Sequence, residues 1–381
     1  MKFAIFILLV ILAPGFSKAN NHNQPFPVLP TTDEQEFPDI YGQTVVWQQF
    51  VSEYGDYDIY VADLNNPTEP LTNIFGDESD QMKPAVFDNY IVWQDFVSWQ
   101  GSADWDIRMA DISDQTDPNT YVVSDIANNN EQNPAIHGNI VVWEDGSPGS
   151  LNIYGADITN PTGPMEFLIA GLNVNQQNPS LYRNHVVWQD SYFGDWDIYA
   201  VDIWRRNIPL EFPVTILESD QQSPVISGNI VVWENNSSGN WDIFAADISE
   251  PNYPEEIAIA VNDSSSLAPD IDGSVIVWQD NRNGNWDIFG YNLVTGHEFQ
   301  ITYNRYDQIN PTISGNIVVW QDYRNGNSEI YAIVLDGPEA AKCTSHVNGD
   351  VNGDCRVDFE DFAVITSQWL ECNIEPTETC L

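Results

Sequence analysis

Acidic side chains near the C-terminus recur at a spacing that suits a bound cation. In the segment 350–361, side-chain oxygens fall at loop positions 1, 3, 5, 9 and 12, and position 7 offers its backbone carbonyl. Hard oxygen ligands at this spacing are typical of a calcium loop. The candidate metal ligands are Asp350, Asn352, Asp354, Arg356, Asp358 and Asp361. The sequence therefore predicts one Ca²⁺ site, against the simpler interpretation of an Asp- and Asn-rich turn.

Apolar residues around this loop support its folding. Val357 stands at loop position 8, where it can anchor the loop to a small core. Phe362, Ile365 and Trp369 follow at i, i+3 and i+7, which predicts an amphipathic helix leaving the loop.

The overall charge limits what the chain can bind. The 381 residues include 12 Lys and Arg against 57 Asp and Glu, for a net charge of −45. Such a surface repels phosphate backbones and anionic lipids, so we expect no nucleic-acid or membrane-surface binding. Because 42% of the residues are hydrophobic, the chain is predicted to bury a core rather than stay disordered.

The two ends of the chain differ from its middle. Residues 1–19 are typical of a secretory signal, with a basic Lys2, an apolar run and small residues before Asn20. No second apolar segment follows, so we expect a secreted protein without a membrane-spanning segment. All four cysteines, Cys343, Cys355, Cys372 and Cys380, lie near the C-terminus, and their disulfide pairing stays open among three possibilities.

The middle of the chain repeats seven times. A Val-Trp pair recurs with spacings of 46, 50, 45, 45, 45 and 42 residues between tryptophans, and a proline precedes each pair by about nine residues. The repeated tryptophans are Trp47, Trp93, Trp143, Trp188, Trp233, Trp278 and Trp320. Each pair is followed by a second phrase, clearest as Asp-Ile-aromatic in Asp242-Ile243-Phe244.

Each unit is predicted to form four short strands. In the fifth copy these are 224–226, 230–234, 242–248 and 258–261, separated by Gly, Asn and Ser turns. Seven such units predict an all-β, seven-bladed β-propeller. The last unit lacks its fourth strand, and Phe26-Pro27-Val28 stands as far before Pro38 as Phe299 stands before Pro311. We therefore expect the N-terminal segment to complete the last blade.

The best-formed repeat, from Pro269 to Phe289, resembles the TolB-like, WD-type propeller repeat. The resemblance covers about residues 24–337. It implies the propeller fold, and a family that mostly binds or scaffolds and includes few enzymes.

Most repeated residues have a structural interpretation. The Val-Trp tryptophans are predicted to pack in the core, whereas Trp105, Trp196, Trp241 and Trp286 are better candidates for ligand contact. The acids that end the second strands, such as Asp190 and Asp280, are predicted to cap turns. Three residues before the prolines we expect a polar, acidic ring facing the channel. It comprises Gln35, Gln81, Gln176, Gln221 and Gln308, with Glu34, Asp80, Asp220 and Asp307 before them.

Signals for catalysis are sparse. His137, His185 and His297 occupy three different places in the unit, so they predict no shared metal site. A carboxylate pair for glycoside hydrolysis stays open, because acids are abundant. However, we find no repeat with acids that the others lack, which favours a non-catalytic protein.

The calcium loop resembles a dockerin module over about residues 346–371. Asp361 stands where sensor loops carry Glu, and Cys355 stands where Gly is usual. A dockerin normally has two loops, and one is complete here. The resemblance implies calcium-dependent docking to a cohesin-like protein, often in polysaccharide-degrading systems.

These observations predict three parts. Residues 1–19 form the signal peptide, 20–337 the propeller, and 338–381 a small helical, disulfide-stapled, dockerin-like tail. We predict a secreted, monomeric, non-catalytic propeller that recognises a protein or a glycan and is anchored by its calcium-binding tail. The alternatives are a carbohydrate-active enzyme, either hydrolase or lyase, and a propeller lectin.

Overall fold

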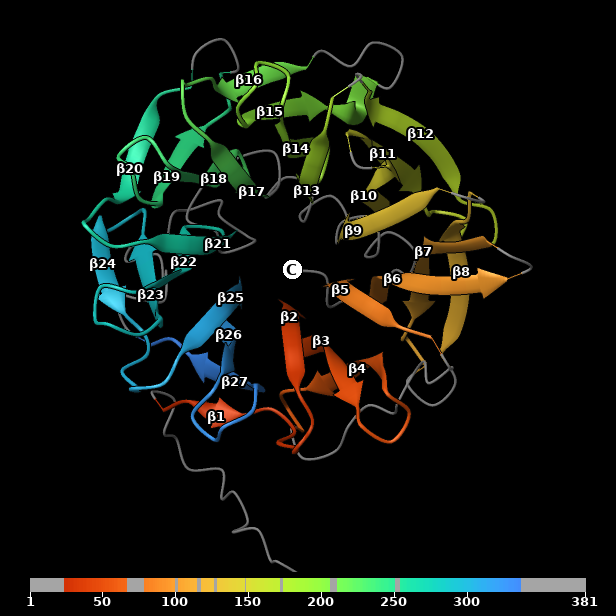
Figure 1. Cartoon of the computed structure of the whole chain (residues 1–381), viewed down its shortest axis with the longest axis horizontal. Coiled ribbons are helices and arrows are strands. Elements are labelled where there is room, and N and C mark those ends of the chain that lie inside the picture. Colours follow the sequence, from red (N-terminus) through yellow and green to blue (C-terminus); the bar gives the residue numbers. More distant parts are fainter. Residues whose placement is uncertain are drawn as a thin grey trace, which may run out of the picture.

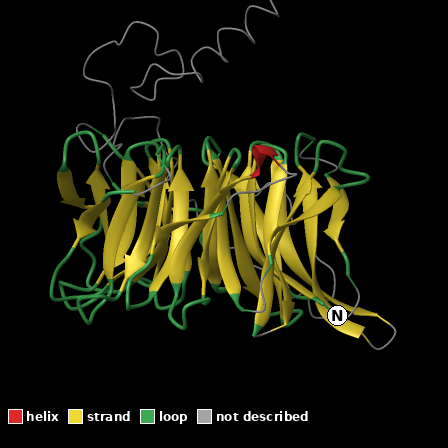
Figure 2. Ribbon diagram, turned by 90° about the horizontal axis from the view of Figure 1, so that it is seen from above, coloured by secondary structure: helices red, strands yellow, loops and turns green. Residues whose placement is uncertain are grey.

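The computed structural model describes residues 24–336, apart from 67–78, 100–101, 115–117, 127–128, 148, 172–173, 206–210 and 251–253. These residues form seven antiparallel sheets around a central axis, as Figure 1 shows. In the side view of Figure 2, the strands stand between two layers of turns and loops. The predicted seven-bladed propeller is therefore confirmed. In this part of the chain, helical structure is limited to a 3₁₀ turn at Ile203–Arg205.

Each blade places its first strand innermost (Figure 1). The inner strands are β2 (Gln35–Tyr41), β5 (Gln81–Phe87), β9 (Asn130–His137), β13 (Gln176–Tyr182), β17 (Gln221–Ser227), β21 (Ser266–Asp272) and β25 (Gln308–Ser314). The second strands are β3 (Thr44–Val51), β6 (Tyr90–Trp99), β10 (Ile140–Ser147), β14 (His185–Asp190), β18 (Ile230–Asn235), β22 (Val275–Asp280) and β26 (Ile317–Asp322).

Third and fourth strands complete the blades toward the outside. The third strands are β4 (Asp56–Asp63), β7 (Ser102–Asp111), β11 (Ser150–Asp157), β15 (Asp197–Asp202), β19 (Asp242–Asp247), β23 (Asp287–Asn292) and β27 (Glu329–Val334). The described fourth strands are β8 (Asn119–Ser124), β12 (Met165–Ala170), β16 (Phe212–Thr215), β20 (Glu256–Ala260), β24 (His297–Gln300) and β1 (Phe26–Pro27). The fourth strand expected in the first blade falls within 67–78, outside the described residues.

The N-terminal strand closes the ring, as the sequence predicts. Phe26 and Pro27 pair with Ala332 and Tyr331 of β27, so the last blade has the order β1-β27-β26-β25. Two hydrogen bonds extend the junction: the N–H of Val28 donates to the Ile330 carbonyl at 2.8 Å, and the N–H of Ile330 donates to Gln35 Oε1 at 3.0 Å. The first and last blades are thus joined through both backbone and side chains.

The core lies between the blades. All seven Val-Trp tryptophans are buried, with at most 2% of each side chain exposed, which confirms their predicted packing role. In six blades this tryptophan stacks on the aromatic residue of the third strand, with ring centroids 6.0–6.5 Å apart. In the second blade, Arg108 takes the place of that aromatic residue opposite Trp93. Burial of both sheet faces explains why the strands are rich in Val, Ile and aromatic residues.

Candidate active site in the central channel

Every inner strand bends at the residue before its proline. At this residue φ lies between +49° and +53°, a left-handed backbone conformation that residues other than glycine rarely adopt. The strand registers shift at the same place, so each inner strand carries a bulge. A bulge redirects nearby side chains, and here one per blade reaches the channel wall. The seven residues are Phe37, Lys83, Asn133, Asn178, Ser223, Ala268 and Asn310.

A hydrogen bond between neighbouring blades holds each bulge. The N–H of the pre-proline residue donates to the side-chain oxygen of the residue after the core tryptophan one blade earlier, at 2.7–3.1 Å. Five of these acceptors are glutamines, whereas Glu144 and Glu234 accept in the third and fifth blades. The bond forms at every blade interface and offsets the strain of the left-handed backbone.

The residue after the proline differs between blades and supplies two of the three acids that line the cavity in the described part of the chain. In chain order these residues are Asp39, Ala85, Ala135, Ser180, Val225, Asp270 and Thr312. The prediction that no repeat carries acids lacking in the others is therefore wrong, both here and at Glu144 and Glu234. Aligning the seven units on their prolines and tryptophans, position by position, is the sequence signal that reveals these exceptions.

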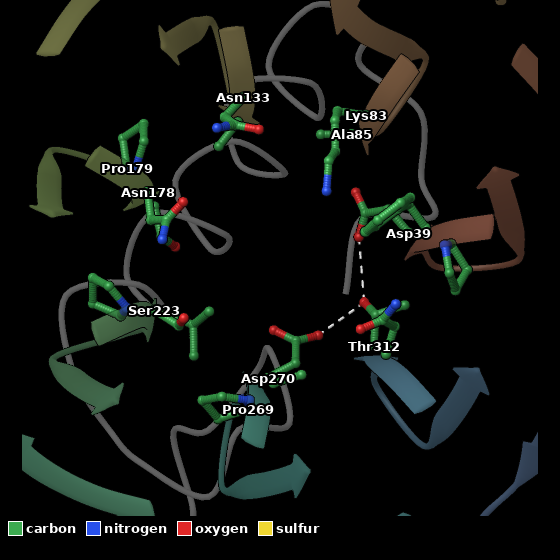
Figure 3. A pocket seen from close by; sticks show the side chains of 18 of the residues that line it. Asp39, Lys83, Ala85, Asn133, Asn178, Pro179, Ser223, Pro269, Asp270 and Thr312 are labelled. Atoms are coloured by element: carbon green, nitrogen blue, oxygen red, sulfur yellow. Dashed lines mark hydrogen bonds between the residues drawn. The ribbon is translucent and has the colours of Figure 1, made fainter. Parts of the chain in front are cut away.

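A single hydroxyl group joins the two aspartates of the channel. Thr312 Oγ1 lies 3.3 Å from Asp39 Oδ1 and 2.8 Å from Asp270 Oδ2, as the dashed lines in Figure 3 mark. A threonine hydroxyl has only one proton to donate. When it donates to one aspartate, a hydrogen bond to the other requires that this aspartate be protonated and donate to the hydroxyl. The arrangement therefore favours one shared proton on the pair.

Backbone hydrogen bonds stabilise both aspartates, and the charge between them separates their pKa values. Both oxygens of Asp39 accept N–H donors, from Ile40 at 2.9 Å and from Val86 at 2.7 Å. Asp270 Oδ2 accepts the N–H of Ile313 at 2.8 Å, and the N–H of Ile271 also donates to Asp270. Burial raises the pKa of Asp39 to about 6 against these N–H bonds, and burial with the nearby Asp39 raises the pKa of Asp270 to about 7. Asp270 is thus the better proton carrier, and Asp39 the better carboxylate.

The rest of the channel wall is asymmetric. The cavity has a volume of about 460 Å³ and is lined by all seven blades. Glu234 lies beside Ala268, whose N–H it accepts at 2.7 Å, and burial raises the pKa of Glu234 to about 7. In Figure 3, the amides of Asn133 and Asn178 lie on the other side of the cavity from Asp39 and Thr312. The acids thus gather on the side of blades five, six and one.

Lys83 is the one cation among the described residues that line this cavity. Its ammonium lies 3.2 Å from the centre of the Phe37 ring, which faces it across a blade interface. Burial lowers the pKa of Lys83 to about 8, and Glu36 and Glu144 oppose this shift. A cation on a partly enclosed aromatic face is stabilised by the ring quadrupole.

The predicted acidic ring is not at the channel surface. Its five glutamines begin the inner strands and are buried, with at most 3% exposed. Gln35 shows the reason, because it accepts the N–H of Ile330 and donates to the Leu29 carbonyl, joining two blades. The acids before them cap backbone N–H groups of the preceding blade, as Glu34 does for Ser328 at 2.7 Å. These residues hold the ring together rather than face a ligand.

The other sequence candidates have separate places. Asp190 and Asp280 accept N–H groups two residues later at 2.8 and 2.9 Å, as expected for turn caps. Four tryptophans near the third strands are half-buried: Trp105 lies within β7, and Trp196, Trp241 and Trp286 directly precede β15, β19 and β23. Among the described residues, no group of three or more His, Cys, Asp and Glu is arranged to hold a metal ion. No helix among them is long and apolar enough to cross a membrane.

Several predictions of the sequence fall outside the described residues. These are the signal at 1–19, the four cysteines, the predicted helix after the loop, and the calcium ligands Asp350, Asn352, Asp354, Arg356, Asp358 and Asp361.

No protein-family model matches the chain, and no curated protein matches it in sequence. Solved structures share its fold at low identity. A puromycin-hydrolysing peptidase of Mycobacterium tuberculosis is 12% identical over 84% of this chain and 54% of its own, with a TM-score of 0.59. This chain thus spans about half the length of that peptidase.

Three further structures match over most of their own length. The β-propeller domain of the Trilobed protease from Pyrococcus furiosus is 12% identical, over 84% of this chain and all of that one, with a TM-score of 0.58. An oligogalacturonate lyase in complex with manganese is 12% identical, over 77% and 86%, with a TM-score of 0.54. A putative TolB from Agrobacterium tumefaciens is 13% identical, over 71% and 94%, with a TM-score of 0.47.

These findings correct the predicted function. The prediction of a non-catalytic binding propeller is contradicted, because the similar propellers include peptidases and a lyase. The argument behind that prediction has also failed, because single blades do carry acids that the others lack. The alternative of an enzyme is favoured instead.

Proposed function

We propose that this protein is a glycoside hydrolase whose active site is the central channel. The observation that carries the proposal is the Asp39–Thr312–Asp270 arrangement, which occurs once in the ring and opens on the cavity. Two adjacent carboxyl groups that hold one proton between them are the usual machinery for hydrolysing a glycosidic bond. The oligogalacturonate lyase, which is matched over 86% of its own length, supports a catalytic use of this fold.

Asp270 would act as the acid and Asp39 as the nucleophile. Asp270, with the higher pKa, would protonate the leaving-group oxygen while Asp39 attacks the anomeric carbon and forms an ester. Water, deprotonated by Asp270, would then release the sugar and restore both carboxyl groups. The bonds through Thr312, of 3.3 and 2.8 Å, hold these two oxygens closer than the roughly 6.5–9.5 Å between the carboxyl groups of inverting enzymes. We therefore expect retention of anomeric configuration.

The substrate would be a neutral or amine-bearing glycan. A net charge of −45 disfavours a uronate chain, and this is why we favour hydrolysis over the lyase alternative. The amide side chains of Asn133 and Asn178, on the other side of the cavity from Asp39 and Thr312, and the hydroxyl of Ser223 offer hydrogen bonds to sugar hydroxyls. The dockerin-like tail supports the same class, because such modules are common in polysaccharide-degrading systems.

Release of reducing ends from a panel of neutral polysaccharides tests the proposal. The second blade carries Ala85 at the position of Asp39 and Asp270, so alanine is compatible with the fold there. Asp270→Ala and Asp39→Ala should each lower kcat/KM by at least ~10²-fold. Asp272→Ser is the matched control: Asp272 accepts the N–H of Gly315 in the next blade, and two other blades carry serine there. Its activity should be unchanged. Activity that survives Asp270→Ala, or a panel without hydrolysis, would contradict the proposal.

We also propose that residues 350–361 bind one Ca²⁺ ion and dock the secreted enzyme on a cohesin-like protein. The ligand spacing supports this, with carboxylates at four of its loop positions. Calorimetry on the full chain should give a stoichiometry of one, lost in the Asp350→Ala, Asp361→Ala double variant. An unchanged stoichiometry would refute the assignment of the loop.

A further inference from the structure

Four aromatic rings form a continuous row where the first four inner strands end. Tyr41, Phe87, His137 and Tyr182 are the last residues of β2, β5, β9 and β13. Successive ring centroids lie 4.5, 4.3 and 4.6 Å apart, and the rings are tilted by 41–54°. Each ring is partly exposed, and Tyr41 is the most exposed at 39%. We call these four residues the aromatic arc.

The arc is not needed to join the blades. In the other three blades the same position holds Ser227, Asp272 or Ser314, and each accepts the N–H of a glycine in the next blade's turn. The serine bonds measure 3.0 and 2.9 Å. Small polar side chains thus close this interface adequately, so four consecutive aromatic residues call for another explanation.

The arc continues the wall of the channel. Asp39 and Tyr41 lie two residues apart in a regular part of β2, pairing with Val46 and Thr44, so their side chains point to the same face. Ile40 between them points into the core and is 5% exposed. Two residues of antiparallel strand span roughly 7 Å. A chain of sugars bound at Asp39 would therefore reach the arc directly.

The chemistry of the arc suits a neutral sugar. Burial and the nearby Arg183 lower the pKa of His137 to about 4, so its ring is uncharged near neutral pH. Aromatic faces carry partial negative charge, which attracts the C–H groups on the apolar face of a sugar ring. The hydroxyls of Tyr41 and Tyr182 add hydrogen-bonding groups at the two ends of the row.

We propose that the aromatic arc binds a neutral oligosaccharide as an extended subsite of the channel. The proposal rests on the proposed hydrolase function for the identity of its ligand. The arc would hold sugar units beyond the one at Asp39 and Asp270, so it would set the affinity for long chains without touching the reacting bond.

Calorimetry can test binding apart from hydrolysis. In an Asp270→Ala background, cellohexaose, xylohexaose and mannohexaose serve as probes. We expect at least one of these hexasaccharides to bind. The double variant Phe87→Ser, Tyr182→Ser should lower the affinity for it at least tenfold. Both substitutions introduce the residue found in the fifth and seventh blades. Tyr192→Ser, which removes a 57% exposed aromatic ring from a different loop, is the control and should leave the affinity unchanged.

The outcomes separate the two proposals. Binding by none of the three probes, or an affinity that the double variant retains while its melting temperature is unchanged, would overturn the subsite. If the double variant unfolds, a second double variant, Phe87→Tyr with Tyr182→Phe, keeps both rings and should bind the oligosaccharide as the parent does. Weakened binding by this variant would contradict binding through the aromatic rings. Arc-dependent binding without any hydrolysis by the parent enzyme would sustain the subsite and reject the hydrolase.

Discussion

Thr312 has one hydroxyl proton and two carboxyl neighbours, and this imbalance sets the chemistry of the channel. Backbone N–H donors reach both carboxyl groups, from Ile40 and Val86 to Asp39 and from Ile271 and Ile313 to Asp270. Burial opposes the ionisation of both groups, and the nearby Asp39 opposes it further at Asp270, so the proton resides preferentially on Asp270. The same residues therefore give an acid and a base at one pH.

This division predicts a bell-shaped pH dependence of hydrolysis. Asp39 must be ionised, so kcat/KM should rise as pH passes about 6, the pKa of Asp39. Asp270 must be protonated, so kcat/KM should fall as pH passes about 7. Initial rates between pH 4 and 9 give the profile. A maximum below pH 5, where both groups are protonated, would contradict the assigned roles.

Glu234 should limit stability at alkaline pH. Its pKa of about 7 lies above the ordinary value because it is buried, so its ionised form is unfavourable in the folded state. Glu234→Gln supplies the residue that five blades carry and keeps an acceptor for the N–H of Ala268. The variant should melt at a higher temperature than the parent at pH 8, and equally at pH 4. Scanning calorimetry at both values measures this, and a lower melting temperature at pH 8 would contradict it.

At the scale of elements, the N-terminal strand closes the ring. Val28 is fully buried against the last blade and donates its N–H to Ile330 at 2.8 Å. Val28→Asp puts a charge into this core and should destabilise the protein by roughly 3 kcal/mol or more. Val294→Asp makes the same change at a 67% exposed residue and should have almost no effect. Thermal unfolding of the two variants compares them, and equal melting temperatures would argue against closure by this strand.

The blades and their closure were predictable because each is encoded many times. The fifth copy illustrates this: the predicted strand at 230–234 is observed at Ile230–Asn235, and 242–248 at Asp242–Asp247. Its inner strand begins earlier than predicted, at Gln221, because the bulge before Pro224 continues the strand instead of ending it. The N-terminal strand was equally predictable, because the last repeat lacks a fourth strand of its own.

The channel site was harder to predict, for a physical reason. Residues before proline ordinarily avoid helical conformations, and their left-handed backbone depends on a bond from the neighbouring blade, as between Ser223 and Gln189. No local pattern encodes that contact. If the contact between blades is not known, nothing in the sequence of β2 shows that Gln35 is buried or that Asp39 faces the channel. Repetition also conceals a site, because a single exception such as Asp270 stands among many similar acids.

At the scale of the whole molecule, buried acids and surface charge both lower the stability of the fold as pH rises. Burial raises the pKa of Asp106 to about 7 and of Glu131 to about 8, besides the channel acids. A raised pKa means that the folded state binds protons more tightly, so stability is lost as pH rises from about 4 to about 8. The net charge of −45 adds repulsion over the same range.

The protein should therefore melt at a higher temperature at pH 5.5 than at pH 8. Salt separates the two causes, because about 1 M NaCl screens surface charges but not buried acids. We expect the difference to shrink in salt without vanishing, as measured by circular dichroism during heating. A melting temperature that increases from pH 5.5 to pH 8 would contradict the effect of the buried acids.

Covalent labelling tests the central claim most directly. An activated 2-deoxy-2-fluoro glycoside of the preferred sugar should trap the ester, because the fluorine slows its hydrolysis. Mass spectrometry of the digested protein should then find one added sugar on the peptide that contains Asp39, and none in Asp39→Ala. A labelled peptide elsewhere in the chain, or an unlabelled protein that still hydrolyses the glycan, would contradict the assignment of Asp39 and Asp270 as the catalytic pair.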